Sequence, residues 1–189
     1  MKKIQEDWQR TVDFHGHACP GLAQGFRASQ AALNALKIDR SEDEELVAIV
    51  ENDACGVDAV QVLTGCTLGK GNLILHNYGK QVFTFARRDQ ALAIRIYVHG
   101  GAVKNAPVDS DEGEKTLQSK KDRIQQLLSL PDEEILIIQQ IKLTVPEKAR
   151  IFNSINCHIC NEKVGEIYAR VRYGKPVCIP CADSYSRGW

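Results

Sequence analysis

The stretch LVAIVENDACGVDAVQVLTG, residues 46–65, decides how the larger part of the chain folds. It opens with an apolar run, Leu46 to Val50, which predicts a short buried strand. Asn52 and Asp53 are N-cap residue types, so we expect them to open a helix that runs to Gly65, where glycine favours a helix end. A strand, a tight turn and a short helix are therefore predicted in succession.

The segments on either side continue this alternation. Residues 20–36 predict a helix, because Pro20 suits the first helical position and apolar residues recur at helical spacing. A polar helix is expected over 111–130, and further strands are expected at 73–75, 81–85, 92–98 and through Ile141, Leu143 and Val145. Because helices follow one another and strands form hairpins, we expect an α+β fold, with a mixed or antiparallel sheet flanked by helices.

Composition limits the classes of protein to be considered. With 189 residues, 43% hydrophobic and 25% charged, the chain can bury a core, so wholesale disorder is excluded. Lys plus Arg and Asp plus Glu both total 24, which excludes a global field that would attract nucleic acid or an acidic membrane. The charged start MKKIQEDWQR has no apolar segment behind it, and no stretch is long enough to span a membrane, so we expect a cytoplasmic protein.

Charge divides the chain near Pro146. Residues 146–189 carry a formal charge of +3 and residues 1–145 a charge of −3. Both CxxC pairs also lie after this point. We therefore expect two parts, an α+β core over 1–145 and a small zinc ribbon over 146–189.

The C-terminal cysteines have the spacing of a metal site. Cys157 and Cys160 form one CxxC pair, Cys178 and Cys181 form another, and 17 residues separate the pairs. Two such pairs present four thiolates to one zinc ion in a tetrahedral, closed shell, so the site is expected to be structural. A redox dithiol or unrelated core cysteines are the alternative interpretation, and His158 is an alternative ligand.

Basic and aromatic residues gather between the two cysteine pairs. They are Tyr168, Arg170, Arg172, Tyr173 and Lys175. Contact with nucleic acid is one interpretation of this pattern, but the charge is modest, so we favour a solvated hairpin face or contact with a protein partner.

A second group of metal-ligating residue types lies near the N-terminus, in FHGHACPG at residues 14–21. It contains His15, His17 and Cys19, just before the helix that starts at Pro20. The N–H groups of a helix N-terminus favour a thiolate, which makes Cys19 a good soft ligand. The alternative interpretation is a small buried cysteine beside two hydrogen-bonded loop histidines.

Cys55 repeats the arrangement of Cys19. It also lies between a strand and a helix, with Asp58 one turn further on. If the two helix starts meet, Cys19, Cys55 and either His17 or His15 would hold a transition metal with an open coordination position. A catalytic role would then fall to His15 or Asp58, which are placed to move protons.

The stretch TGCTLGKGN, residues 64–72, invites comparison with a phosphate-binding loop, but its glycine spacing is wrong and it follows a helix. We expect a tight glycine turn here, with Cys66, Thr67 and Lys70 as further candidates for lining a pocket.

At these residues the chain resembles the FmdE family, which is named for a component of molybdenum or tungsten formylmethanofuran dehydrogenase. The resemblance rests on FHGHACPG at 14–21, on ENDACGVDAVQVLTGCTLGKGNL at 51–73, on YGKQVFTF at 78–85, and on the C-terminal CxxC pairs. It implies an α+β core that forms an intertwined homodimer, a metal in a core cavity and a zinc-ribbon tail.

The resemblance also carries ligand roles over to this sequence. It implies that His17, Cys19 and Cys55 bind the core metal, which we expect to be zinc. His15, Asp58 and Cys66 are implied as supporting or alternative residues.

Three functions fit these observations. The first is an accessory, metal-handling protein of molybdenum enzymes, whose ribbon docks a protein partner. The second is a small metal-dependent enzyme that uses the open position at the core metal. The third is a regulator that senses a metal or metabolite and contacts nucleic acid through the ribbon.

Overall fold

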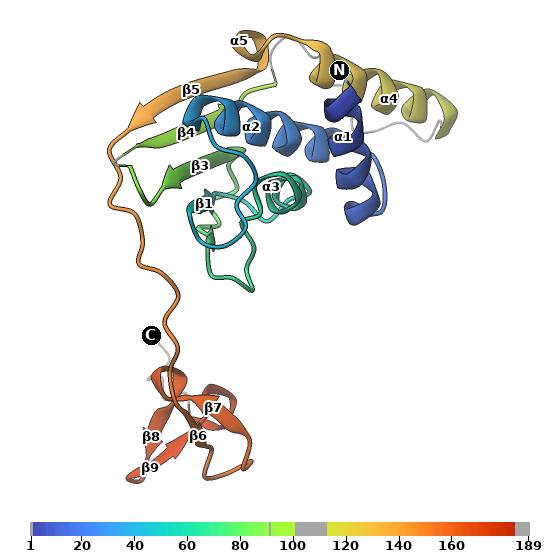
Figure 1. Cartoon of the computed structure of the whole chain (residues 1–189). Helices are drawn as coiled ribbons and strands as arrows, with labels where there is room; N and C mark the ends of the chain where they lie inside the picture. The colour runs from blue at the N-terminus through green and yellow to red at the C-terminus, as the bar shows by residue number, and fades with distance from the viewer. Residues whose placement is uncertain (1, 91, 101–112, 184–189) are drawn as a thin grey trace. The chain divides into compact units, whose positions relative to one another are not determined.

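The computed structural model describes residues 2–90, 92–100 and 113–183, without the side chains of 113–118. Its chain separates into two compact units (Figure 1), Met1–Lys148 and Ala149–Trp189. We refer to them as the core unit and the ribbon unit, and describe each by itself.

The core unit is built on a mixed sheet of five strands. They are β1 (Leu46–Val50), β2 (Leu73–Leu75), β3 (Val82–Arg87), β4 (Ala93–Val98) and β5 (Leu136–Ile141). Their order in the sheet is β2-β1-β3-β4-β5. β1 and β2 run parallel, and the other neighbours are antiparallel. The expected α+β class with a mixed sheet is confirmed.

Helices cover one side of this sheet (Figure 1). They are α1 (Lys2–His15), α2 (Pro20–Leu36), α3 (Gly56–Thr64), α4 (Gly113–Ser129) and the single turn α5 (Asp132–Ile135). The chain passes from β1 through α3 to the parallel strand β2, so the carboxyl ends of β1 and β2 lie at the same edge of the sheet.

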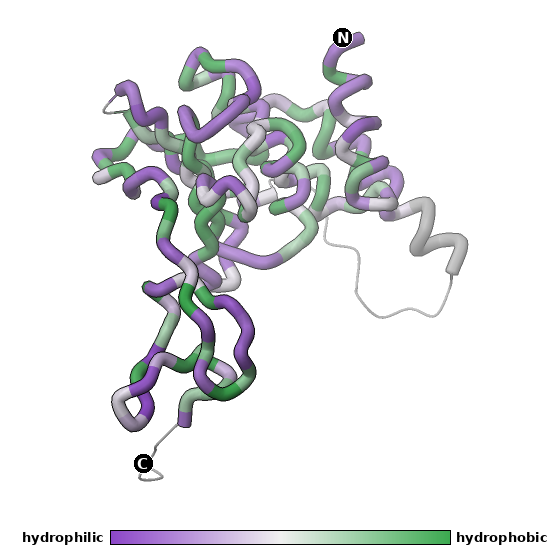
Figure 2. Tube along the Cα trace, turned by 60° about the horizontal axis from the view of Figure 1, so that its bottom comes forward, coloured by the Kyte–Doolittle hydropathy of each residue, from purple (hydrophilic) through white to green (hydrophobic). Residues whose placement is uncertain are grey.

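The main hydrophobic core lies between α2 and the sheet. Alternate residues of the central strands face it, among them Leu46, Ala48 and Val50 of β1 and Phe83 and Phe85 of β3, each at most 1% exposed. Figure 2 shows the hydrophobic segments gathered inside the core unit and the hydrophilic ones at its periphery. The position of this core follows from the period-two pattern of the strands.

Several elements begin and end within two residues of the predicted positions, residues 111 and 112 of the expected polar helix lie outside the described residues, and two elements differ by more. The helix expected from Asn52 starts later, at Gly56, because Asn52 Oδ1 accepts the Ala54 N–H at 3.1 Å in a turn that precedes the helix, while its amide donates to the Lys80 carbonyl oxygen at 2.6 Å. The last strand ends at Ile141 and does not include Leu143 and Val145, because β4 pairs with Leu136–Ile141.

Helix α1 was not expected from the sequence. Of its residues only Thr11 is buried, and its apolar residues Ile4, Trp8 and Val12 recur every four positions in an otherwise polar segment. Trp8 holds it to the core through an edge-on contact with Phe26 of α2, with ring centroids 5.2 Å apart.

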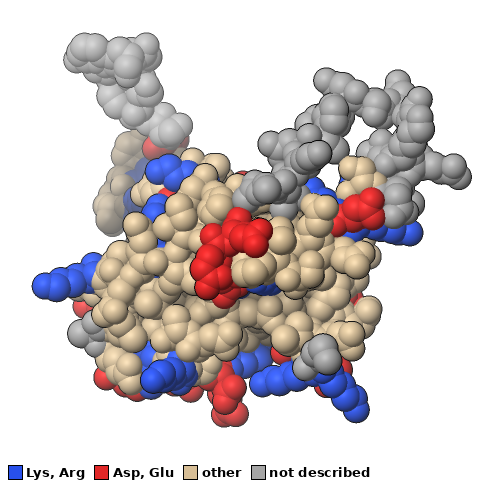
Figure 3. All heavy atoms as spheres, turned by 90° about the horizontal axis from the view of Figure 1, so that it is seen from above, with Lys and Arg blue, Asp and Glu red and all other residues tan. Residues whose placement is uncertain are grey.

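The surface fits the balanced composition. On the face seen in Figure 3, acidic and basic side chains are interspersed. No helix within the described residues combines the length and the apolar character that crossing a membrane requires.

The ribbon unit consists of two small hairpins. β6 (Ser154–Asn156) pairs with β7 (Lys163–Gly165), and β8 (Arg170–Arg172) pairs with β9 (Lys175–Val177). The 3-10 turns η1 (Glu166–Tyr168) and η2 (Ile179–Cys181) complete it.

Candidate metal centres

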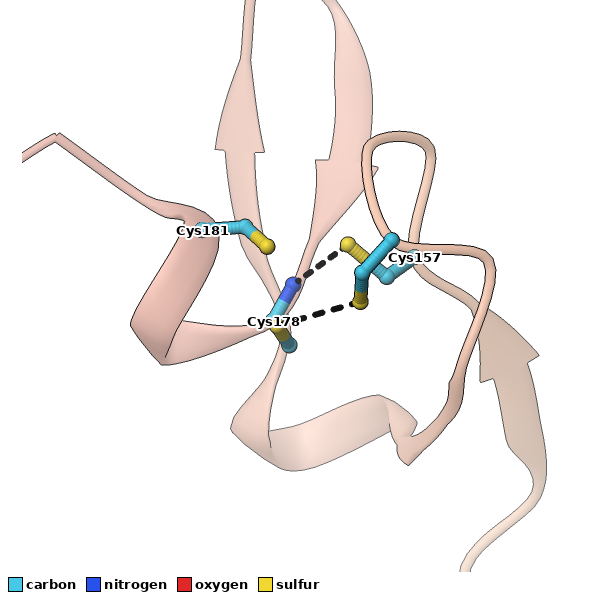
Figure 4. A group of neighbouring side chains, drawn as sticks. Cys157, Cys178 and Cys181 are labelled. Carbon is cyan, nitrogen blue, oxygen red and sulfur yellow. Dashed lines mark hydrogen bonds between the residues drawn. The ribbon is translucent and has the colours of Figure 1, made fainter.

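The four ribbon cysteines lie on two turns, and Figure 4 shows Cys157 of the first turn facing Cys178 and Cys181 of the second. Cys157 and Cys160 follow β6, in a turn closed by Asn161, whose backbone N–H donates to the Cys157 carbonyl oxygen at 2.9 Å and whose φ is 62°. Cys178 and Cys181 follow β9, in a 3-10 turn closed by the Cys181 N–H and the Cys178 carbonyl oxygen, 3.0 Å apart. Each CxxC turn thus presents two sulfurs on one side.

The distances between the sulfurs suit one tetrahedral ion. All four Sγ atoms lie within 4.8 Å of one another. Thiolates bound at about 2.3 Å in a tetrahedron are about 3.8 Å apart. The Sγ atoms of Cys160 and Cys178 are separated by 3.8 Å. The residues therefore fit a closed four-thiolate metal site.

Electrostatics within the cluster also favour a cation. The backbone N–H groups of Cys160, Cys178 and Ile159 lower the pKa of Cys157 to about 6, the Cys178 N–H lying 3.3 Å from the sulfur (Figure 4). By contrast, the hydrogen bond with the Cys178 thiol, together with burial, raises the pKa of Cys181 to about 12. The protein alone thus favours the thiolate at Cys157 and disfavours it at Cys181, and a bound cation would favour ionisation of both.

A second cluster forms in the core unit, where α1 ends and α2 begins. One ligand atom each of His15, His17 and Cys19 lies within 4.8 Å of the others. Cys19 is the N-cap of α2, and its Sγ accepts the Leu22 N–H at 3.3 Å, as the sequence predicts. Burial nevertheless raises the pKa of the Cys19 thiol. A cation is therefore needed to hold this sulfur as a thiolate.

His15 lies between a carboxylate and a sulfur. Its Nδ1–H donates to Asp58 Oδ2 at 2.6 Å, and its Nε2 faces Cys19 Sγ at 4.0 Å. Metal-binding histidines commonly donate their second ring N–H to a carboxylate, which fixes the tautomer and turns the other nitrogen to the ion. A tetrahedral zinc ion would separate a nitrogen and a sulfur ligand by about 3.6 Å. Asp58 thus fixes the orientation of the His15 ring.

Cys55 reaches this region through a close contact between α2 and α3. The backbones touch at Gly25 and Gly56, where a Cβ on Gly25 would lie 2.1 Å from the Gly56 carbonyl oxygen. A Cβ on Gly21 would lie 3.9 Å from Cys55 Sγ, and the Cys55 thiol contributes to the raised pKa of Cys19. Cys55 is therefore a neighbour of Cys19, although its sulfur is not one of the three atoms within 4.8 Å.

A hollow of about 400 Å³ adjoins the core cluster. Its polar wall comes from His15, Cys55, Asp58 and neighbouring residues of the β1–α3 connection. Its apolar wall includes Val50 and Leu75, at the carboxyl ends of β1 and β2. This edge of an open sheet is where ligands commonly bind in α/β units.

The glycine turn after α3 contributes less to this site than the sequence suggests. Cys66 is fully buried, and its thiol donates to the Leu46 carbonyl oxygen at 3.4 Å, away from either cluster. Lys70 contacts the carbonyl oxygens of Glu42 and Asp43 at 3.1 and 3.2 Å. Leu68, an apolar residue with no distinguishing signal in the sequence, lines the hollow instead.

Comparisons with known proteins agree with these observations. Residues 14–137 match the family described as "FmdE, Molybdenum formylmethanofuran dehydrogenase operon". A crystal structure of a tungsten formylmethanofuran dehydrogenase FmdE-like protein from Syntrophus aciditrophicus has a TM-score of 0.65 and 25% identity, covering 94% of this chain and 91% of that one.

A longer relative is also similar. The "Probable S-adenosyl-L-methionine-binding protein" of Archaeoglobus fulgidus is 32% identical over 196 residues. The match covers 93% of this chain and 52% of that protein, so the chain spans about half of its length. Because the family match begins at the FHGHACPG motif and ends just inside β5, it takes in the three residues of the core cluster, the start of α3 and the strands β1 to β4. This chain belongs to the FmdE family.

Proposed function

We propose that this chain is a metal-binding accessory protein connected with molybdenum or tungsten enzymes. It carries a structural zinc ion in the ribbon unit and a second transition metal, also zinc, in the core unit. The observation that carries the proposal is the convergence of His15, His17 and Cys19 beside a hollow of about 400 Å³. The connection with molybdenum or tungsten enzymes is supported by the family and by the name of the Syntrophus protein.

Zinc in the ribbon unit is supported by the size of that unit as well as by its sulfur geometry. Among residues 149–183 only Cys157 and Val177 are buried, so the unit has very little hydrophobic core. A unit this small needs another source of stability, and a closed four-thiolate zinc site supplies it.

In the core unit, the imidazole of His15 and the thiolate of Cys19 are the best-supported ligands. Asp58 holds the His15 ring in the required tautomer, and Leu22 donates to the Cys19 sulfur. His17 completes a set of three donors, and Cys55 is a neighbouring alternative thiolate. Imidazole and thiolate donors suit zinc among the divalent metals, and three of them leave the fourth coordination position open.

Metal analysis of the full chain, purified without chelators, tests the proposal. We expect about two equivalents of zinc per chain, one for each cluster of ligands. Cys19→Ser should lose one equivalent and Cys178→Ser the other, whereas the control Cys66→Ser should keep both, because Cys66 belongs to neither cluster. Two equivalents retained in Cys19→Ser would refute the core site.

A second candidate function is a small metal-dependent enzyme, and the hollow beside His15 is the observation that favours it. A zinc ion there would act as a Lewis acid towards a carbonyl group. The chain's own residues would orient the guest, with Asp58 holding the His15 proton and the apolar wall excluding water. Turnover of small formyl or carbonyl compounds that is lost in both His15→Asn and His17→Ala would support this function, and absence of turnover in the zinc-loaded parent would reject it.

S-adenosylmethionine is a probe for the hollow and not its proposed guest, because this chain spans only 52% of the Archaeoglobus fulgidus relative. Equilibrium dialysis of the chain with S-adenosylmethionine tests whether this compound binds. Binding that His15→Asn abolishes would place this compound in the hollow.

We also propose that the protein is a homodimer and that the ribbon unit contacts a protein partner. Apolar side chains exposed on β4 and β5 support the dimer, among them Tyr97 at 41% and Ile137 at 46%. In the ribbon unit Val171 is 80% and Tyr173 is 87% exposed, which supports contact with a protein. Arg172 is already paired with Asp183, which makes a nucleic-acid surface less favourable. Light scattering of the purified chain tests the dimer.

A further inference from the structure

A second hollow of the core unit shares the lining residue Gln61 with the hollow beside His15. Its volume is about 480 Å³. We call it the arginine hollow, and it is lined by Arg10, Phe14, Arg40, Gln61, Val62 and Thr67. None of these lining residues is acidic, and the hollow has two cationic residues, Arg40 and Arg10, of which Arg10 is paired with Asp7.

Arg40 is held in place from two sides. Its Nε–H donates to the Val62 carbonyl oxygen at 3.1 Å, at the end of α3. Its stem passes over the turn at Gly65, where a Cβ would lie 3.3 Å from Arg40 Cγ. Within the described part of the chain, the two terminal nitrogens of Arg40 have no hydrogen-bond partner, so a fixed guanidinium edge remains free to donate.

Arg10 and Phe14 supply the opposite wall. They lie one turn apart on α1, so both side chains reach the same side of the helix. Arg10 pairs with Asp7 at 3.1 Å but stays 55% exposed. Phe14 is 59% exposed, which is unusual for a phenylalanine and leaves an aromatic ring available to a guest.

We propose that the arginine hollow binds an organic anion, a phosphate or carboxylate group attached to an apolar or planar body. The guanidinium of Arg40 would receive the anionic group, with Arg10 as the second cation and Phe14 against the apolar body. Gln61 and Thr67 offer further polar contacts between them. The hollow at His15 has two acidic residues, Asp53 and Asp58, in its lining, so the two hollows differ in the charge they accept.

The proposed subsite also has a physical connection to the core cluster. Gln61 lines both hollows, and its Nε2 donates to Asp58 Oδ1 at 3.4 Å. Asp58 Oδ2 in turn accepts a hydrogen bond from the His15 Nδ1–H. Gln61 is therefore the residue that connects an anion held at Arg40 with the Asp58 carboxylate, which orients His15.

Titration of the full, isotope-labelled chain with phenyl phosphate and with benzoate tests the proposal by NMR. Either anion should shift the Arg40 Nε–H and Thr67 backbone signals saturably, and uncharged benzyl alcohol should not. Tighter binding of phenyl phosphate assigns the hollow to phosphate esters, and tighter binding of benzoate assigns it to carboxylates. Binding should weaken as salt is added.

Variants separate the subsite from general charge effects. Arg40→Gln should weaken binding at least about tenfold, because it removes the charge-assisted hydrogen bonds. Arg10→Gln, at a more exposed side chain, repeats the test should Arg40→Gln fold poorly. Lys121→Gln on α4, a matched loss of one exposed charge outside the hollow, should leave binding unchanged. Absence of saturable binding by both anions, or equal affinity in Arg40→Gln, Arg10→Gln and the parent, overturns the proposal.

Discussion

Replacing Gly25 by alanine tests whether the backbone contact of α2 with α3 builds the core metal site. A Cβ at this position would lie 2.1 Å from the carbonyl oxygen and 2.4 Å from the Cα of Gly56. Both are backbone atoms, which cannot swing aside as the end of a side chain can. Real Cβ atoms essentially never approach closer than 3.0 Å, so the two helices must separate by about 0.9 Å or more.

The energetic cost follows from this separation. Overpacking a well-packed interior costs typically 1–3 kcal/mol, and a backbone clash lies at about the upper end. Alanine recovers about 1 kcal/mol in helix propensity over glycine. We therefore expect Gly25→Ala to lower the free energy of unfolding by about 2 kcal/mol. A separation near 1 Å also exceeds the roughly 0.2 Å tolerance of metal–ligand distances, so zinc should bind the core cluster more weakly.

Urea unfolding followed by Trp8 fluorescence measures the first effect, because Trp8 packs against Phe26 on α2. A Trp189→Phe background leaves Trp8 as the single tryptophan, since the chain has two. Gly69→Ala is the matched control, because a Cβ there would meet nothing within 4 Å. Cobalt substitution, read by its thiolate charge-transfer bands, measures the second effect. A Gly25→Ala variant as stable as the parent, with unchanged cobalt affinity, would refute the reasoning.

Three further predictions concern single side chains of the core unit. The side chain of Arg27 is 10% exposed and donates to Asp132 at 2.6 Å and to the Leu127 carbonyl oxygen at 2.5 Å, so Arg27→Met should lower the free energy of unfolding in urea by about 2 kcal/mol. Asp132 is 38% exposed, so Asp132→Asn should lower it by about 1 kcal/mol or less, and equal losses in the two variants would contradict this difference. Burial raises the pKa of the Cys66 thiol from 9.0 to about 11, so between these pH values the unfolded state loses this proton while the folded state keeps it. The free energy of unfolding should therefore fall by about 2 kcal/mol as the pH rises from 9 to 11. The dependence of this free energy on pH should be weaker in Cys66→Ala, and an identical dependence would exclude this thiol as its source. Asp58→Asn should weaken zinc binding at the core cluster by about 10–100-fold while the ribbon zinc stays bound, because the variant removes the carboxylate that orients His15. Competition with a chromogenic chelator measures both affinities, and an unchanged core affinity would show that Asp58 does not orient this ligand.

Local pattern in the sequence is sufficient for the elements whose signals lie within one segment. Helix α2 combines Pro20 at its start with apolar residues on the face that meets the sheet, and the structure places it at Pro20–Leu36 as expected. Strand β1 is apolar throughout because its residues are covered on both faces, and it too occupies the predicted residues, Leu46–Val50. In both elements the apolar residues that give the local pattern are also the residues that become buried, so the pattern is enough to locate the element.

Other elements depend on partners that the local pattern does not identify. Helix α1 is polar overall, and its helical signal is limited to Ile4, Trp8 and Val12, which recur every four residues, while Trp8 meets its partner Phe26 on α2. The alternation at Ile141, Leu143 and Val145 resembles a strand, but pairing with β4 uses Leu136–Ile141. Edge strands can expose both faces, and four residues of β5 are exposed, so hydrophobic alternation gives its position poorly.

The two metal clusters differ in the same way. In the ribbon unit each CxxC turn orients its own two sulfurs, so the spacing of Cys157, Cys160, Cys178 and Cys181 suffices to group them. In the core unit the sequence leaves His15 and His17 as alternatives. The orientation of His15 comes from Asp58, which lies 43 residues away along the chain. No local pattern could supply that contact.

This difference has a consequence for how each cluster responds to change elsewhere in the protein. The ribbon cluster is made by turns that close on themselves, and we expect metal binding there to be coupled to folding of a small unit. The core cluster instead takes its shape from a fold that already exists, through the contact of Gly25 with Gly56 and the reach of Asp58. Substitutions that shift α2 against α3 should therefore alter core metal affinity without removing a ligand, whereas the ribbon cluster should respond only to changes in its own turns. A site built by tertiary contacts in this way leaves room for a guest, because its ligands need not close around the ion from all sides.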